Sequence, residues 1–112
     1  MIEEYQFGRI VIDGCEYRRD VIILPESIKA DWWRLEGHLL QVADLQDVLA
    51  AAPDVLIVGT GNSGVMQVAD EVRQRLAAEG IELHALRTPL ACEEYNRRLG
   101  RGDVAAALHL TC

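Results

Sequence analysis

The sequence has little of what marks metal-dependent, redox and membrane proteins. Its three cysteines, Cys15, Cys92 and Cys112, are far apart and form no Cys-x-x-Cys pair, so the pattern predicts neither a zinc ribbon nor a dithiol redox site. No apolar run approaches the ~20 residues of a membrane helix. The acidic amino terminus has neither a signal-peptide core nor an Arg-rich transit pattern. These absences favour a soluble, cytoplasmic protein with no direct membrane insertion.

Positive charge is also scarce. Lysine and arginine together number 11 against 18 aspartates and glutamates, which gives a formal net charge of -7. Because nucleic-acid binding depends on clustered basic side chains that neutralise phosphates, nucleic acid is not expected as a partner. The chain has 112 residues, and this length predicts a single domain over residues 1–112 with a core of its own.

The first third of the chain has the pattern of antiparallel β structure. Residues 5–12 are rich in strand formers and are followed by Asp13-Gly14 and then by residues 15–18. An Asp-Gly pair between two strand-like runs indicates a hairpin with a two-residue turn. Residues 21–24 form a continuous apolar run, which is typical of a strand buried on both faces.

From residue 44 onward, helical and strand-like patterns alternate. Asp44 is the expected N-cap of a first helix, and Thr88 is the expected N-cap of the last one. An apolar stripe from Val65 to Leu76 predicts a middle helix that begins directly behind a glycine-rich loop. The expected strands are residues 54–58, 81–86 and 104–110. This order predicts an α/β fold, a compact three-layer Rossmann-like sandwich with parallel βαβ units and an N-terminal antiparallel β-hairpin attachment.

The glycine-rich loop is the strongest candidate for a ligand site. Its residues are Gly59, Thr60, Gly61, Asn62, Ser63 and Gly64, which match Gly-x-Gly-x-x-Gly. Between a strand and a helix, the backbone N–H groups of such a loop bind an anion, with the hydroxyl groups of Thr60, Ser63 or Thr88 assisting. A dinucleotide site also needs an acid at the end of the next strand, and Leu86-Arg87-Thr88 stands there instead.

Two interpretations of this loop stay open. The glycines can serve only to turn the chain and to let helix and strand pack closely. Alternatively, the loop holds a small anion or a nucleotide fragment, in a binding protein or an enzyme.

A pair of tryptophans is the second feature. Trp32 and Trp33 are adjacent and are followed by Arg34. In an extended segment, neighbouring side chains point in opposite directions, so one tryptophan is expected in the core and the other at the surface. Because Trp and Arg are enriched in interaction hot spots, Trp32, Trp33 and Arg34 are predicted as an interaction surface.

The sequence contains no recognisable catalytic constellation. His38, His84 and His109 lack metal-ligand spacing, and the latter two fall in expected strands, where a structural role is the simpler interpretation. Ser63 lacks the flanking glycine of a nucleophile elbow. No catalytic residue, metal site or cofactor is therefore predicted. A thiol enzyme is the least favoured alternative, and Cys15 and Cys92 are interpreted as small buried side chains.

Several short stretches occur in the order known from one family. They are Tyr5-x-Phe-Gly-x-Ile10-x-Ile12-x-Gly14, Val21-Ile-Ile-Leu24-Pro25, Trp33-Arg34 with Gly37-His38, Leu56-Ile-Val-Gly-Thr-Gly61, Gly80-Ile81, Thr88-Pro89-x-Ala91, Tyr95-Asn96 and Val104-Ala-Ala-Ala-Leu108. Over nearly its whole length the chain resembles the Mth938-like domain family, small single-domain proteins related to mitochondrial complex I assembly factor three and to the adipogenesis-associated domain protein.

The resemblance carries expectations about fold and function. It implies a three-layer fold with a Rossmann-like βαβ part, and it brings no established activity or catalytic residue. Mitochondrial members of the family act through protein partners during assembly of a membrane complex. The resemblance therefore implies an assembly-factor-type interaction module, with protein partners or self-association.

Overall fold

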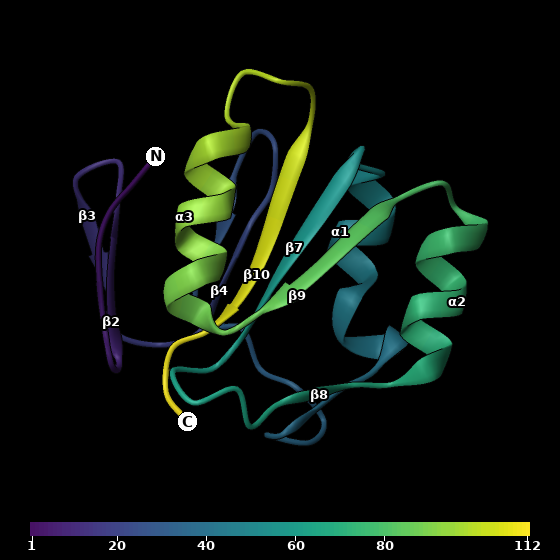
Figure 1. Ribbon diagram of the computed structural model, residues 1–112, viewed down its shortest axis with the longest axis horizontal. Helices are drawn as coiled ribbons and strands as arrows, with labels where there is room; N and C mark the ends of the chain where they lie inside the picture. Colours follow the sequence, from purple (N-terminus) through teal and green to yellow (C-terminus); the bar gives the residue numbers. More distant parts are fainter.

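A five-stranded mixed sheet organises the molecule, which is described here over residues 1–112 by a computed structural model (Figure 1). The strands in spatial order are β5 (Ile28–Lys29), β4 (Val21–Ile23), β10 (Val104–His109), β7 (Val55–Thr60) and β9 (Glu82–Leu86). Strands β10, β7 and β9 are parallel, whereas β4 runs antiparallel to both of its neighbours. The predicted α/β class and its parallel βαβ units are confirmed, and the buried strand predicted at residues 21–24 joins the same sheet.

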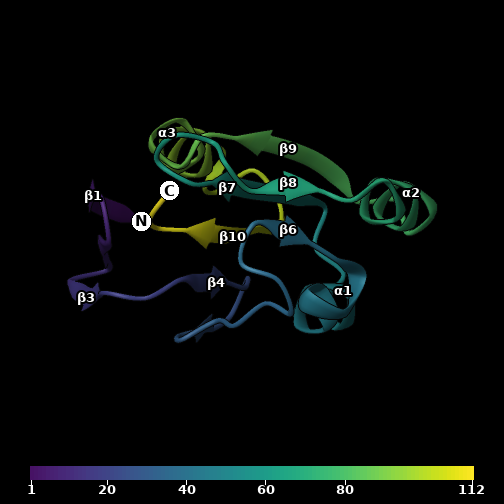
Figure 2. The same ribbon diagram turned by 90° about the horizontal axis from the view of Figure 1, so that it is seen from below.

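Helices cover both faces of this sheet. They are η1, a 3-10 turn (Val42–Leu45), α1 (Gln46–Ala51), α2 (Asp70–Ala78) and α3 (Thr88–Arg98). Figure 2 shows α3 on one side of the sheet and α1 with α2 on the other, so that three layers result. None of these helices has the length and apolar character needed to cross a membrane.

Strand alternation divides the core into two halves. Ala106 and Leu108 of β10 pack with Ala91 and Tyr95 of α3, whereas Ala105 and Ala107 point to the opposite half, which α1 and α2 cover. Successive side chains of a strand point to opposite faces, so the buried run in β10 serves both halves. Its alanines leave room for the helices to lie close to the sheet.

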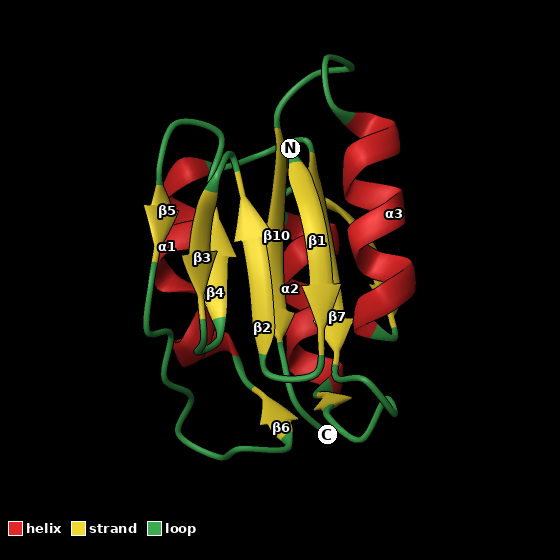
Figure 3. Cartoon of the chain, turned by 90° about the vertical axis from the view of Figure 1, so that its left-hand side faces the viewer, coloured by secondary structure: helices red, strands yellow, loops and turns green.

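A second, three-stranded antiparallel sheet lies beside α3, on the same face of the main sheet, and faces the viewer in Figure 3. It consists of β1 (Ile2–Gln6), β2 (Arg9–Ile12) and β3 (Cys15–Tyr17). Asp13 (φ 48°) and Gly14 (φ 82°) both have positive φ, as the predicted Asp-Gly hairpin requires. The interpretation of residues 5–12 as one strand-like run before the hairpin is wrong. The chain reverses after Gln6, and that residue pairs with Arg9.

The helix expected directly behind the glycines begins later. Val65 and Met66 are not helical, and β8 (Gln67–Val68) pairs in parallel with β6 (Leu39–Leu40) before α2 starts at Asp70. The N–H of Gln67 donates to the His38 carbonyl at 2.8 Å, and this pairing holds the segment extended. The apolar stripe beginning at Val65 is therefore partly a strand pattern, which short windows do not separate from a helix.

Both predicted N-caps are displaced by one or more residues. Asp44 lies inside η1, where its carboxylate accepts the N–H groups of Gln41 at 2.8 Å and Leu35 at 3.0 Å. Thr88 is the first helical residue of α3, and Arg87 occupies the N-cap position. The Thr88 hydroxyl is engaged with other elements instead of capping its own helix.

Candidate functional site

A pocket of about 470 Å³ lies beside the carboxyl end of β10. Chain connections explain why a site forms here: α2 carries the chain from β7 to β9, and α3 returns it across the opposite face to β10. The border between β7 and β10 is thus the point at which the strand order reverses. Open α/β sheets bind ligands outside the carboxyl ends of strands at such a point.

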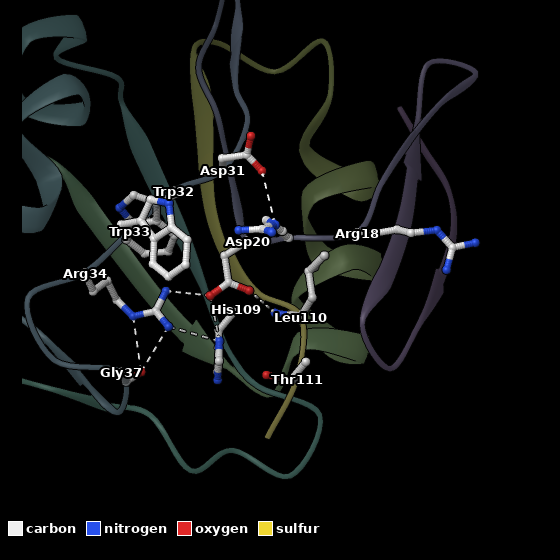
Figure 4. Close-up of a pocket in the computed structure, with 11 residues that line it drawn as sticks. Arg18, Asp20, Asp31, Trp32, Trp33, Arg34, Gly37, His109, Leu110 and Thr111 are labelled. Carbon is white, nitrogen blue, oxygen red and sulfur yellow. Dashed lines mark hydrogen bonds and ion pairs between the residues drawn. The ribbon is translucent and has the colours of Figure 1, made fainter.

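A polar cluster of Asp20, Arg34 and His109 forms one wall of the pocket (Figure 4). Asp20 Oδ2 accepts from Arg34 Nη1 at 2.8 Å and lies 2.8 Å from His109 Nδ1. The side chains of Arg34 and His109 are only 5% and 8% exposed. Burial alone would raise the pKa of Asp20, but hydrogen bonds with His109, the Leu110 N–H and Arg34 outweigh it and hold that pKa below its usual value.

Arg34 is fixed in place by several contacts. Its Nε and Nη2 donate to the Gly37 carbonyl at 3.3 Å and 3.0 Å, and its guanidinium lies 4.8 Å from the Trp32 ring centroid. Trp32 is itself held by its indole N–H, which donates to the Asp44 carbonyl at 3.0 Å. A planar cation with this many partners is a rigid part of the pocket.

His109 is polar on both sides of its ring, but only one side has a partner. Nδ1 faces the Asp20 carboxylate and also lies 3.1 Å from Arg34 Nη2. Because an ionised carboxylate only accepts, Nδ1 carries the hydrogen donated to Asp20. The other ring nitrogen, Nε2, is buried without a hydrogen-bond partner. His109 thus has the buried, paired position expected of a structural histidine on one side of its ring, and a nitrogen without a partner on the other.

The two tryptophans differ as expected. Trp32 is 4% exposed and belongs to the core, whereas Trp33 is 74% exposed. The Arg19 guanidinium lies 5.6 Å from the Trp33 ring centroid, and the neighbouring Leu35 is 73% exposed. Of the three residues predicted as an interaction surface, only Trp33 lies on the surface. Trp32 is in the core, and the side chain of Arg34 is 5% exposed.

The glycine-rich loop follows β7 at the same end of the sheet. The Gly61 N–H donates to Thr88 Oγ1 at 2.9 Å, and the Asn62 N–H donates to the Thr111 carbonyl at 2.7 Å. The N–H groups of Ser63 and Val65 both donate to the Cys112 carbonyl at 3.2 Å. The loop thus holds residues 111–112 of its own chain, and no helix N-terminus stands behind it.

Two of the glycines are required by close approach. A Cβ on Gly61 would lie 2.3 Å from the Cys112 backbone carbon, and a Cβ on Gly59 would lie 2.8 Å from Thr88 Oγ1. Thr88 Oγ1 in turn donates to the His109 carbonyl at 2.6 Å, which ties the loop and α3 to β10. These contacts give the glycines the structural use that the sequence left open, and binding of an anion there stays a prediction.

The cysteines are in different surroundings. Burial, followed by the charge of Glu93, raises the pKa of the Cys92 thiol to about 12, so a reactive thiolate is not favoured at this position. Cys15, expected to be buried, is exposed, because it opens strand β3 at the outer edge of the N-terminal sheet.

Sequence reasoning did not find the Asp20–His109 pair. The two residues are 89 positions apart, and Arg34 is 75 positions from His109. The only local signal was that Arg19-Asp20 interrupts a strand-rich region just before a buried strand. A charged residue beside a buried strand marks a position worth examining, but the pattern does not reveal its partner.

The fold and pocket define a small doubly wound α/β protein with a polar site at its switch point. Within this class, the chain belongs to the family described as "Protein of unknown function (DUF498/DUF598)", whose model matches residues 2–109.

Solved structures agree with this assignment. The chain is 30% identical to the conserved hypothetical protein PH1505 from Pyrococcus horikoshii OT3, with a TM-score of 0.87 and coverage of 100% of this chain and 99% of that chain. It is 29% identical to Rpa2829 from Rhodopseudomonas palustris, with a TM-score of 0.75 and coverage of 97% and 82%. A Bordetella pertussis protein described as a Mth938-like domain shares the fold at 21% identity, with a TM-score of 0.69 and coverage of 98% and 85%. The resemblance to the Mth938-like family is confirmed.

Proposed function

We propose that this protein works as an assembly-factor-type interaction module in the cytoplasm, and that a protein partner or a second copy docks on Trp33, Leu35 and Arg19. The observation that carries the proposal is the exposure of two large apolar side chains, Trp33 at 74% and Leu35 at 73%, within one short segment. Exposed tryptophan flanked by arginine is the composition typical of interaction hot spots.

The segment is also held rigidly, which favours binding. Trp32 anchors it in the core, and Arg34 ties it to Asp20 and Gly37. A surface that is ordered before binding loses little conformational freedom when a partner docks. The resemblance to assembly factors supports the same interpretation.

Substitution of the exposed side chains tests the proposal. Tagged wild-type protein and the variants Trp33→Ala and Leu35→Ala are purified from the native host under mild conditions. Leu90→Ala, which truncates an exposed leucine on α3, is the matched control. A stoichiometric partner or a dimer is expected with wild type and Leu90→Ala, and Trp33→Ala should weaken it by about 2 kcal/mol. A complex of equal strength in all four proteins, or none with wild type, contradicts the proposal.

The alternative function, small-anion or nucleotide-fragment binding by Gly59–Gly64 with Thr88, is supported by the loop's place at the switch point. Its N–H groups already bond to Thr111 and Cys112, so an anion would have to displace this segment. A thermal-shift panel of phosphates and nucleotides tests it, since a ligand at 100 times its Kd adds about 2.7 kcal/mol of stability. A flat panel removes this alternative.

A further inference from the structure

The unpartnered nitrogen of His109 points to a ligand. From its surroundings we propose that the pocket binds a small carboxylic acid with an apolar or aromatic body, whose carboxyl group meets His109 Nε2. This goes beyond the interaction surface, because the site is the pocket wall beneath Trp33 and involves a small molecule. In Figure 4 the free ring nitrogen points away from Asp20, and it has no solvent-exposed surface of its own.

The first argument is the state of the imidazole. Nδ1 donates to Asp20, and Nε2 has no partner, although 92% of the His109 side chain is buried, given its 8% exposure. A buried polar atom without a hydrogen bond destabilises the folded protein, and a ligand that supplies the bond recovers that loss. A carboxylate paired with Nδ1 also stabilises the positive ring that forms when Nε2 takes a proton.

The charges of the pocket explain why an acid fits. Arg34 pairs with Asp20, Arg19 lies 3.9 Å from Asp31, and Arg18 turns away to pair with Glu16 at 2.7 Å. The charges inside the pocket therefore balance. A carboxylate that arrives together with one proton adds no net charge, and the proton forms the hydrogen bond whether it lies on the ligand oxygen or on Nε2.

The remaining surroundings suit the body of the ligand. The exposed ring of Trp33 gives apolar surface, and a volume of about 470 Å³ lies within the range of small-molecule sites. The exposed His38 ring packs edge-on against His109, with 6.1 Å between centroids. Because Nε2 is buried, a ligand reaches it only when a neighbouring side chain moves, and the exposed ring of His38 is the neighbour that the proposal assigns to this movement.

The test compares an acid with its neutral isostere. Benzoate and benzamide are titrated into the whole protein while the ¹⁵N resonances of the histidine rings and the fluorescence of the tryptophans are followed. Benzoate is expected to move the His109 Nε2 resonance in the direction of a protonated nitrogen and to bind about tenfold more tightly than benzamide, since one charge-assisted hydrogen bond is lost with the amide. Equal affinity for benzoate and benzamide, or resonance shifts confined to residues outside the pocket, overturns the proposal. Both results can be read from the wild-type protein alone.

Two variants locate the effect. His109→Gln should remove benzoate binding while its backbone spectrum remains that of the folded protein. His84→Gln changes a partly exposed histidine on β9 that pairs with Glu82, and it should leave binding unchanged. Benzoate binding that survives in a folded His109→Gln protein refutes the role of the imidazole.

The pH dependence of benzoate affinity measures whether a proton is taken up on binding. The charged and titratable groups that face His109 are Asp20, Arg34 and His38, and those at the rim are Arg18, Arg19 and Asp31. Because the complex holds one extra proton, benzoate affinity should fall by up to about tenfold per pH unit above neutrality. His38→Ala should show the same profile, which excludes His38 as the group that holds the proton. Affinity for benzoate that does not change between about pH 6 and pH 8 contradicts proton-coupled binding.

Discussion

At Asp20, one carboxylate joins three parts of the chain that are far apart in sequence. Arg34 and His109 share its Oδ2, and the Leu110 N–H donates to Oδ1 at 2.7 Å. Its side chain is only 15% exposed, so water replaces few of these bonds when the group is altered. The arrangement of the pocket wall therefore depends on one charge.

Removing that charge should destabilise the fold. In Asp20→Asn the amide keeps the shape but leaves the buried Arg34 without its counter-ion, and breaking a pair of this kind lowers the free energy of unfolding by about 3 kcal/mol. Urea unfolding measures the change. Asp31→Asn is the matched control, because Asp31 is 66% exposed and 3.9 Å from Arg19, and exposed pairs contribute about 0–1 kcal/mol. Equal losses in both variants would show that the Asp20 pair has no special role.

The same carboxylate makes stability depend on pH. The pKa of Asp20 is lower in the folded protein than its ordinary value of 3.8, so the folded state holds its proton less tightly than the unfolded state. The contribution of Asp20 to the free energy of unfolding is complete above this ordinary pKa of 3.8, and it is lost as pH falls through the lower pKa of the folded protein. Unfolding free energies of wild type should therefore fall more steeply with acid than those of Asp20→Asn. Parallel curves in the acid range contradict this assignment.

At the scale of elements, the glycine-rich loop and residues 110–112 form one unit. Gly61 has a φ of 108°, and the Cys112 backbone occupies the space that a side chain would need. The N–H groups of Asn62, Ser63 and Val65 all bond to this segment. The loop therefore binds its own chain, and any ligand would compete with that contact.

Gly61→Ala should displace this segment. The backbone strain and the 2.3 Å approach together should lower the unfolding free energy by about 2–4 kcal/mol, since overpacking and positive φ both destabilise. Gly14→Ala is the control, because Gly14 also has a positive φ of 82° but no atom lies within 4 Å of the added Cβ. Amide exchange at Asn62 and Ser63 should accelerate only in Gly61→Ala. Similar effects of both substitutions would show that φ alone decides.

Prediction at this scale succeeded where local chemistry was sufficient. The Asp13-Gly14 turn, the buried strand at Val21–Ile23 and the three parallel strands follow from turn residues and hydrophobic period. The segment after Gly64 was predicted wrongly, because β8 forms only by pairing with Leu39–Leu40, about 28 residues earlier in the chain. The reversal at Phe7-Gly8 was missed because the strand formers on either side form one continuous run.

On the scale of the whole molecule, the central strand of the main sheet is the last one in sequence. β10 lies between β4 and β7, with α3 on one face and the α1–α2 layer on the other. Its six residues are all buried. The main sheet is complete only when residues 104–109 have inserted, so it should open as one cooperative unit.

Native-state hydrogen exchange tests this cooperativity. The amides of β7 and β10 should exchange only through global unfolding, with opening free energies that equal the value from urea, in the range of about 5–15 kcal/mol. The edge strand β3, with two of its three residues exposed, should exchange at lower free energy. Faster exchange in β10 than in β3 would refute the cooperative assembly.

The sequence by itself determined the α/β class, the parallel units, the Asp-Gly hairpin and the division of the tryptophans into one buried and one exposed side chain, because each depends on the period and chemistry of neighbouring residues. Only the tertiary structure decided that Asp20, Arg34 and His109 meet, that residues 111–112 fill the glycine-rich loop and that β10 is central. These features arise from contacts between segments up to 89 positions apart, which no local pattern encodes.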